Sequence, residues 1–163
     1  YLYFGGGTPS LIPPNALERF LAHLRDRGYL SPAALGTLEL HPEFFADETA
    51  AVAFLRVLRR YGLSRVSVGY QASDDDLLRA TKRRHDAGFL PGAMALLRAE
   101  GVTHVYVGQR QGRVNSSGEN AINPHLLAES ASYRLVYQQD RVWIFQVLGV
   151  PPGQGSAVGR ERF

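Results

Sequence analysis

Short apolar runs alternate with longer stretches of helical spacing in the first half of the chain. The runs cover residues 1–4, 37–40 and 66–68 and are rich in residues that favour strands. In the stretches after the first two runs, apolar residues recur every three to four positions, as a helix with one buried face requires. The apolar members are Leu17, Phe20, Leu21 and Leu24 in the first helix and Val52, Leu55, Val57 and Leu58 in the second.

Residues at the boundaries of these helices support the same prediction. The Pro-Pro pair at residues 13–14 suits a first helical turn, and Gly28 suits the end of that helix. Asp47 can cap the second helix, which we expect to end at Gly62. A third helix is predicted to open at residues 73–76, where three aspartates favour a helix amino terminus. Its last turn is predicted to carry Lys82, Arg83, Arg84 and His85.

Strands alternate with helices in the first half of the chain, and this order favours a parallel sheet. The second half has a different order of elements. It predicts a helix at 91–99, a strand at 102–109, a polar loop at 110–123, a short helix at 124–130, and a hairpin of strands at 133–137 and 142–147. The predicted fold is therefore α/β: a partial parallel (βα)3 half-barrel-like sheet, then a smaller αβ(α)ββ segment that ends in an antiparallel hairpin. The predicted units are residues 1–88, residues 89–149, and a flexible tail at 150–163 rich in Pro and Gly.

Composition, charge and the length of apolar runs exclude several classes of function. The chain has 163 residues, of which 45% are hydrophobic and 20% charged, and its net charge is +3. No run has the length of a membrane span and no secretory leader is visible, so we expect a cytoplasmic globular protein. The basic residues lack the aromatic interleaving of nucleic-acid-binding surfaces, so no nucleic-acid partner is expected. The five histidines lie at no metal-like spacing, and no catalytic residue is predicted.

The glycines Gly5, Gly6 and Gly7 directly follow the first apolar run, and Thr8 begins the next helical turn. Glycine lets bare backbone approach another group and adopts angles that other residues avoid. At the carboxyl end of a strand in an α/β fold, that group is often a ligand. The alternative is a tight turn between strand and helix with no ligand.

Three ordered blocks resemble one known family. They are Tyr-Phe-Gly-Gly-Gly-Thr-Pro-Ser-Leu at 3–11, Leu-Glu-Leu-His-Pro-Glu at 38–43, and Arg-Val-Ser-Val-Gly-Tyr-Gln at 65–71 with Arg-Arg-His at 83–85. The first resembles the S-adenosylmethionine (SAM)-binding strand of radical SAM enzymes. The nearest group is the oxygen-independent coproporphyrinogen III oxidase-like family, with its related haem chaperones, and the resemblance covers residues 1–86. It implies a protein of porphyrin biosynthesis.

The resemblance implies SAM as a cofactor and assigns positions to it. The backbone of Gly5, Gly6, Gly7 and Thr8 would approach the methionyl amino group, and Glu39 would face the same ammonium. Gln71 would lie near the ribose, and Arg83 would pair with the carboxylate of the ligand. Each side chain also has an alternative explanation that involves no ligand. Glu39 would then face solvent at a sheet edge, Gln71 would bind loop amides, and Arg83 would interact with the carboxyl terminus of a helix.

The family also uses an iron–sulfur cluster, held by a Cys-x-x-x-Cys-x-x-Cys loop before the glycine strand. The chain contains no cysteine and opens inside an apparent strand without methionine. Without thiolates the cluster has no ligands. We therefore expect a fragment that keeps SAM-contact positions but is not catalytic alone.

Residues 90–148 have a second, weaker resemblance, to the soluble carboxyl-terminal domain of some bacterial multi-span membrane glycosyltransferases. It rests on Leu-Arg-x-x-Gly-Val-x-x-Val-Tyr-Val-Gly and on the hairpin pattern. Together the two resemblances imply a chimera joined near residues 86–91. The alternatives to a radical SAM fragment are thus a fused or designed α/β domain without ligand, and an accessory domain of a membrane glycosyltransferase.

Overall fold

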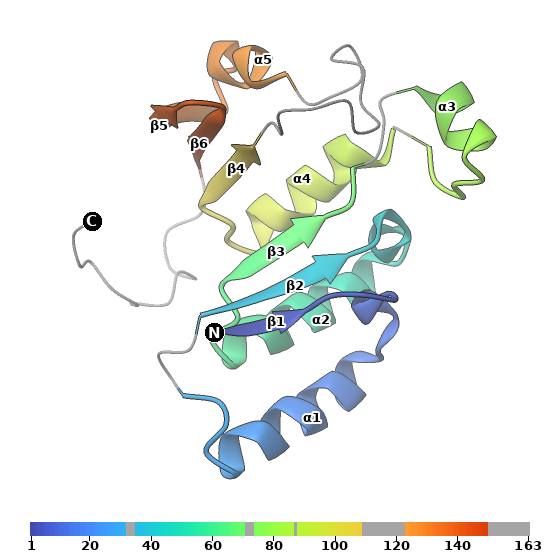
Figure 1. The fold of residues 1–163 in the computed structure, drawn as a ribbon, viewed down its shortest axis with the longest axis vertical. Coiled ribbons are helices and arrows are strands. Elements are labelled where there is room, and N and C mark those ends of the chain that lie inside the picture. The colour runs from blue at the N-terminus through green and yellow to red at the C-terminus, as the bar shows by residue number, and fades with distance from the viewer. Residues whose placement is uncertain (32–34, 71–73, 87, 109–122, 150–163) are drawn as a thin grey trace. The chain divides into compact units, whose positions relative to one another are not determined.

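The computed structural model describes residues 1–31, 35–70, 74–86, 88–108 and 123–149 (Figure 1). Predictions for Gln71, for most of the polar loop at 110–123 and for the tail at 150–163 lie outside the described residues. The chain divides into two compact units, Tyr1–Ala93 and Met94–Phe163. Both contain helices and strands, one around a parallel sheet and the other around an antiparallel sheet, which confirms the predicted α/β class.

The first unit is organised on a three-stranded parallel sheet. Its strands are β1 (Leu2–Phe4), β2 (Gly36–Leu40) and β3 (Arg65–Val68), in the order β1-β2-β3. Leu38 pairs with Phe4 on one side and with Val66 on the other. The strand crossovers contain α1 (Pro14–Asp26) and α2 (Glu48–Arg60), which pack against each other beside the sheet (Figure 1). Short 3-10 turns, η1 (Pro9–Leu11) and η2 (Pro42–Ala46), precede the two helices.

Side chains on α1 and α2 supply much of the core of this unit. Leu17 and Leu21 on α1 are fully buried, as the helical spacing predicts. Phe20 is not: it is 47% exposed and meets the ring of Phe4 edge-on at 6.1 Å. On α2 the pattern missed Phe54, which is 1% exposed, whereas Val52 is only half-buried. The helical spacing thus predicts which face of each helix is buried, but not each residue of that face.

The caps of α2 agree with the sequence. The carboxylate of Asp47 accepts a hydrogen bond from the Ala50 amide at 3.0 Å, which satisfies one of the orphan donors of the first turn. At the other end Gly62 adopts a φ of +75°, the left-handed conformation that commonly closes a helix.

The third helix is shorter than predicted. α3 (Asp75–Ala80) is capped by Asp74, whose carboxylate accepts from the amides of Asp76 and Leu77. It ends at Ala80, because Lys82 turns to the left-handed φ of +57°, and the hydroxyl of the capping Thr81 donates to the carbonyls of Leu77 and Leu78. Arg83, Arg84 and His85 therefore lie in a loop after the helix and not in its last turn.

The second unit is built on an antiparallel sheet in the order β4-β6-β5. Its strands are β4 (His104–Gly108), β5 (Tyr133–Gln139) and β6 (Val142–Val147), and α5 (Pro124–Glu129) packs on β5 and β6. The remaining helix, α4 (Phe89–Ala99), contains the boundary between the units. Val107, Trp143 and Phe145 form the core cluster. The predicted hairpin is confirmed, and β4 joins it as a third strand.

Candidate functional site

The carboxyl ends of the three parallel strands meet at one edge of the first unit and line a hollow of about 350 Å³. Because parallel strands all end on the same side, residues far apart in sequence arrive together there. The lining includes Gly7 and Thr8 after β1, Glu39 and His41 from the end of β2, Ser67 from β3, and Arg83 after α3. Four residues that the family resemblance assigns to SAM thus share one hollow: Gly7, Thr8, Glu39 and Arg83.

The three glycines differ in what a side chain at each position would meet. A Cβ on Gly5 would lie 2.3 Å from Cε1 of Tyr3, so the ring of Tyr3 occupies the space that a side chain would need. Gly6 and Gly7 instead have φ values of +75° and +55°, which side chains disfavour. A Cβ on either would meet no described atom within 4 Å. Gly6 and Gly7 therefore present bare backbone to open space, whereas Gly5 makes room for a ring.

Glu39 is held by the glycine loop. The hydroxyl of Tyr3 donates a hydrogen bond to Oε1 of Glu39, and the amide of Gly6 donates to Oε2 at 3.4 Å. The hydrogen bond to Glu39, with burial and the negative charge of that carboxylate, raises the pKa of Tyr3 above its usual value. Glu39 is thus not a carboxylate that merely faces solvent, because its two oxygens are directed by Tyr3 and Gly6.

A hydrogen bond ties the loop after β1 to the end of β2. The amide of His41 donates to Oγ of Ser10 at 3.0 Å. The imidazole of His41 accepts at Nδ1 from the amide of Glu43 at 3.3 Å, which caps η2. These contacts fix the position of the His41 ring at the rim of the hollow.

His85 also lines the hollow, and the sequence quoted it only as part of the Arg-Arg-His block and assigned it no role. Its ring lines the hollow and meets the ring of His41 edge-on at 5.7 Å and that of Phe89 at 5.5 Å. Both ring nitrogens are closed off from solvent and have no hydrogen-bond partner among the described residues. Burial, with smaller electrostatic effects of His41 and Arg83, lowers the pKa of His85 below its usual value.

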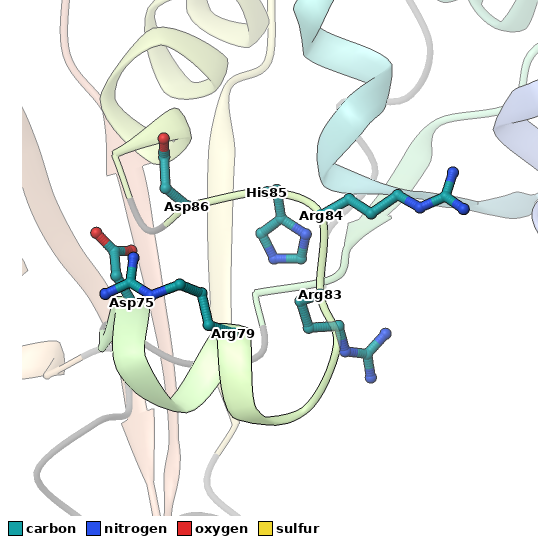
Figure 2. Close-up of a pocket in the computed structure, with 6 residues that line it drawn as sticks. All are labelled: Asp75, Arg79, Arg83, Arg84, His85 and Asp86. Carbon is teal, nitrogen blue, oxygen red and sulfur yellow. The ribbon is translucent and has the colours of Figure 1, made fainter.

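A smaller hollow of about 180 Å³ lies beside the first and shares Arg83 and His85 with it. Figure 2 shows the imidazole of His85 within the group of labelled side chains, while the guanidinium groups of Arg83 and Arg84 point outward. Asp75, Arg79 and Asp86 complete the lining. α3 and the loop after it thus bring an imidazole and several charged side chains to one region.

The described residues hold no group of three or more His, Cys, Asp or Glu side chains that could bind a metal ion. Likewise, within the parts of the chain that the structure describes, every helix is too short or too polar to cross a membrane.

The radical SAM superfamily model matches residues 1–110, which is more than half of the chain. The chain belongs to the radical SAM superfamily. This match includes the glycine loop, Glu39, Gln71 and Arg83, and it continues past the junction that the second resemblance implied at residues 86–91.

Curated relatives place this superfamily member near the coproporphyrinogen oxidase-like group. The heme chaperone HemW of Mycobacterium tuberculosis is 33% identical over 121 residues, which cover 74% of this chain and 30% of the relative. The oxygen-independent coproporphyrinogen III oxidase of Paracoccus denitrificans is 27% identical over 150 residues, covering 92% of this chain and 31% of the relative. The chain thus spans under a third of the length of these relatives.

No solved structure matches the chain. The resemblance of residues 90–148 to membrane glycosyltransferases finds no support in these comparisons, since the Paracoccus relative aligns with 92% of this chain. The radical SAM family uses SAM and an iron–sulfur cluster, so the residues present can be compared with both groups.

The residues fit SAM in part and do not fit the cluster. One hollow is lined by a carboxylate, a guanidinium and glycine backbone that faces open space. The methionyl end of SAM carries an ammonium and a carboxylate, and these two side chains have the complementary charges. The chain contains no cysteine, so the thiolate ligands of a cluster are not among its residues.

Proposed function

We propose that the hollow at the carboxyl edge of the parallel sheet binds SAM. The observation that carries this proposal is that Gly7, Glu39 and Arg83, which the family resemblance assigns to one ligand, line one hollow. A methionyl end bears an ammonium and a carboxylate, and Glu39 and Arg83 bear the complementary charges.

The proposal assigns a separate task to each group. The carboxylate of Glu39 binds the ammonium, with Tyr3 and Gly6 fixing the direction of its oxygens. The guanidinium of Arg83 binds the carboxylate of the ligand, and the exposed backbone of Gly7 lets the ligand approach closely. Gln71 is proposed for the ribose on the strength of the family resemblance.

We further propose that these 163 residues bind SAM without cleaving it, since cleavage in the family needs a reduced cluster. Porphyrin biosynthesis is the proposed context and the cytoplasm the proposed compartment. The relatives are a chaperone and an oxidase by name, so they support a shared cofactor more directly than a shared substrate.

Calorimetric titration of the full chain with SAM tests the proposal. We expect binding in the wild type and a loss of about tenfold in affinity in Glu39→Gln, because a charge-assisted hydrogen bond becomes a neutral one. Glu18→Gln is the matched control: that carboxylate pairs with Arg60 and does not line the hollow, so SAM affinity should stay unchanged. Absence of binding at millimolar SAM, or equal effects of the two variants, contradicts the proposal.

A further inference from the structure

Ser67 lies on β3, where its exposed side chain lines the hollow. In the parallel sheet Ser67 is in register with Glu39 on β2, the strand beside β3 in Figure 1. Side chains at paired positions of neighbouring parallel strands lie on the same face of the sheet, and the strands are about 4.8 Å apart. The hydroxyl of Ser67 is therefore a direct neighbour of the Glu39 side chain.

The donors that hold Glu39 come from the other side of β2. Tyr3 belongs to β1 and Gly6 to the loop after it, and β2 lies between β1 and β3. Among the described residues, no donor from β3 reaches Glu39, and the hydroxyl of Ser67 has no hydrogen-bond partner. The side of Glu39 that faces β3 is thus open to a ligand, with Ser67 next to it.

The two side chains suit a ligand group that donates more than one hydrogen bond. A primary ammonium carries three N–H donors, and each oxygen of Glu39 can accept a second hydrogen bond besides the one from the chain itself. The hydroxyl oxygen of Ser67 has two lone pairs and can accept from the same ammonium. An anionic group at this position would instead be repelled by the charge of Glu39.

We propose that Ser67 accepts a hydrogen bond from the ammonium that Glu39 binds, so that β2 and β3 hold this group together. The inference rests on the proposed function and extends it, because it makes Ser67 a residue that determines specificity for a primary ammonium. Glu39 supplies the negative charge, and Ser67 supplies a second acceptor that fixes the direction of the N–H bonds.

The test compares SAM with its deamino analogue, in which a hydrogen atom replaces the amino group while the sulfonium, the carboxylate and the nucleoside are retained. Both probes are titrated calorimetrically into the full chain. We expect the wild type to bind the analogue at least about tenfold more weakly than SAM. Ser67→Ala should weaken SAM binding by about fivefold, because a hydrogen bond to a charged group is lost, and binding of the analogue by less than about twofold.

Two further variants separate the hydroxyl from other effects of the substitution. Ser67→Thr keeps a hydroxyl and suits a strand, so it should retain more SAM affinity than Ser67→Ala. Ser64→Ala is the matched control, since Ser64 is also exposed but does not line the hollow, and the affinity for both probes should stay unchanged. Because Ser67 is exposed, Ser67→Ala should leave the urea midpoint of unfolding unchanged.

The outcomes separate the two proposals. Equal losses for SAM and the analogue in Ser67→Ala, or no loss for either, overturn the inference, while the proposed SAM site stands. If the analogue does not bind the wild type at millimolar concentration, SAM alone decides: more affinity in Ser67→Thr than in Ser67→Ala supports the inference, and equal affinity overturns it. Failure of the wild type to bind SAM overturns the inference and the proposed function together.

Discussion

Gly7→Ala separates the stability of the glycine loop from its capacity to bind a ligand. Gly7 has a φ of +55°, and a Cβ there would meet no described atom within 4 Å. The cost to folding is therefore conformational: an L-residue in the left-handed region loses about 1–2 kcal/mol. For a chain of this size, about 1 kcal/mol lowers the melting temperature by about 2–4 °C.

Gly28 at the end of α1 provides a matched control. Its φ is +76° and a Cβ on it would also meet nothing within 4 Å among the described residues, but Gly28 does not line the hollow. Gly28→Ala should thus lower the free energy of unfolding by about the same 1–2 kcal/mol as Gly7→Ala.

The two variants should differ in ligand affinity. Gly7 lines the space that we assign to SAM, and a methyl group on it would meet no described atom, so we expect at least about tenfold weaker binding, whereas Gly28→Ala should bind like the wild type. Urea unfolding measures the first quantity and calorimetric titration the second. Equal SAM affinities in the two variants would refute the assignment of the open space to the ligand. A far larger loss of stability in Gly7→Ala would refute the claim that the methyl group meets no protein.

Two further predictions concern stability. A Cβ on Gly36 would lie 2.3 Å from Cδ2 of Leu63, so Gly36→Ala should lower the free energy of unfolding by about 1–3 kcal/mol. Adding Leu63→Ala to the same chain should relieve part of that overpacking. If urea unfolding shows that the effects of the two substitutions are additive, this explanation is wrong. His85 has a lowered pKa in the folded state, so the unfolded chain binds its proton more readily. The free energy of unfolding should therefore fall as the pH drops below about 6.5 toward that lowered pKa. In His85→Phe the urea midpoint should fall less over the same pH range. Identical pH profiles of the two proteins would show that His85 does not cause this pH dependence.

Much of the fold could be predicted because the signals are local. The Asp47 cap, the proline start of α1 and the Gly28 end each act within a few residues of themselves. The predicted length of α3 was wrong, because acid and base at the two ends fit a longer helix equally well. The helix ends where Lys82 turns to a left-handed conformation, which charge patterning does not indicate.

The site was only partly predictable for a different reason. The sequence placed Gly7, Thr8, Glu39 and Arg83 in one ligand site through the family resemblance, and the structure brings these four to one hollow. It assigned no role to His85, because the contacts of that ring with His41 and Phe89 depend on how the chain returns after α3. The Arg-Arg-His spelling at 83–85 was the available signal.

The role of Gly5 also could not be predicted from local sequence patterns. Its role depends on the ring of Tyr3, two residues earlier, folding over its backbone, which no spacing rule describes. The partner choice of β4 likewise depends on long-range pairing with β6, and local patterns do not specify such a partner.

The hydrogen bonds from Tyr3 and Gly6 to Glu39 have a consequence for the order of folding and binding. Both oxygens of this carboxylate have a donor from the chain itself, and each can accept a second hydrogen bond. The proposed ammonium would therefore add to these contacts instead of replacing them, and folding needs no ligand to satisfy the charge. Binding at this carboxylate would then require little rearrangement of the glycine loop.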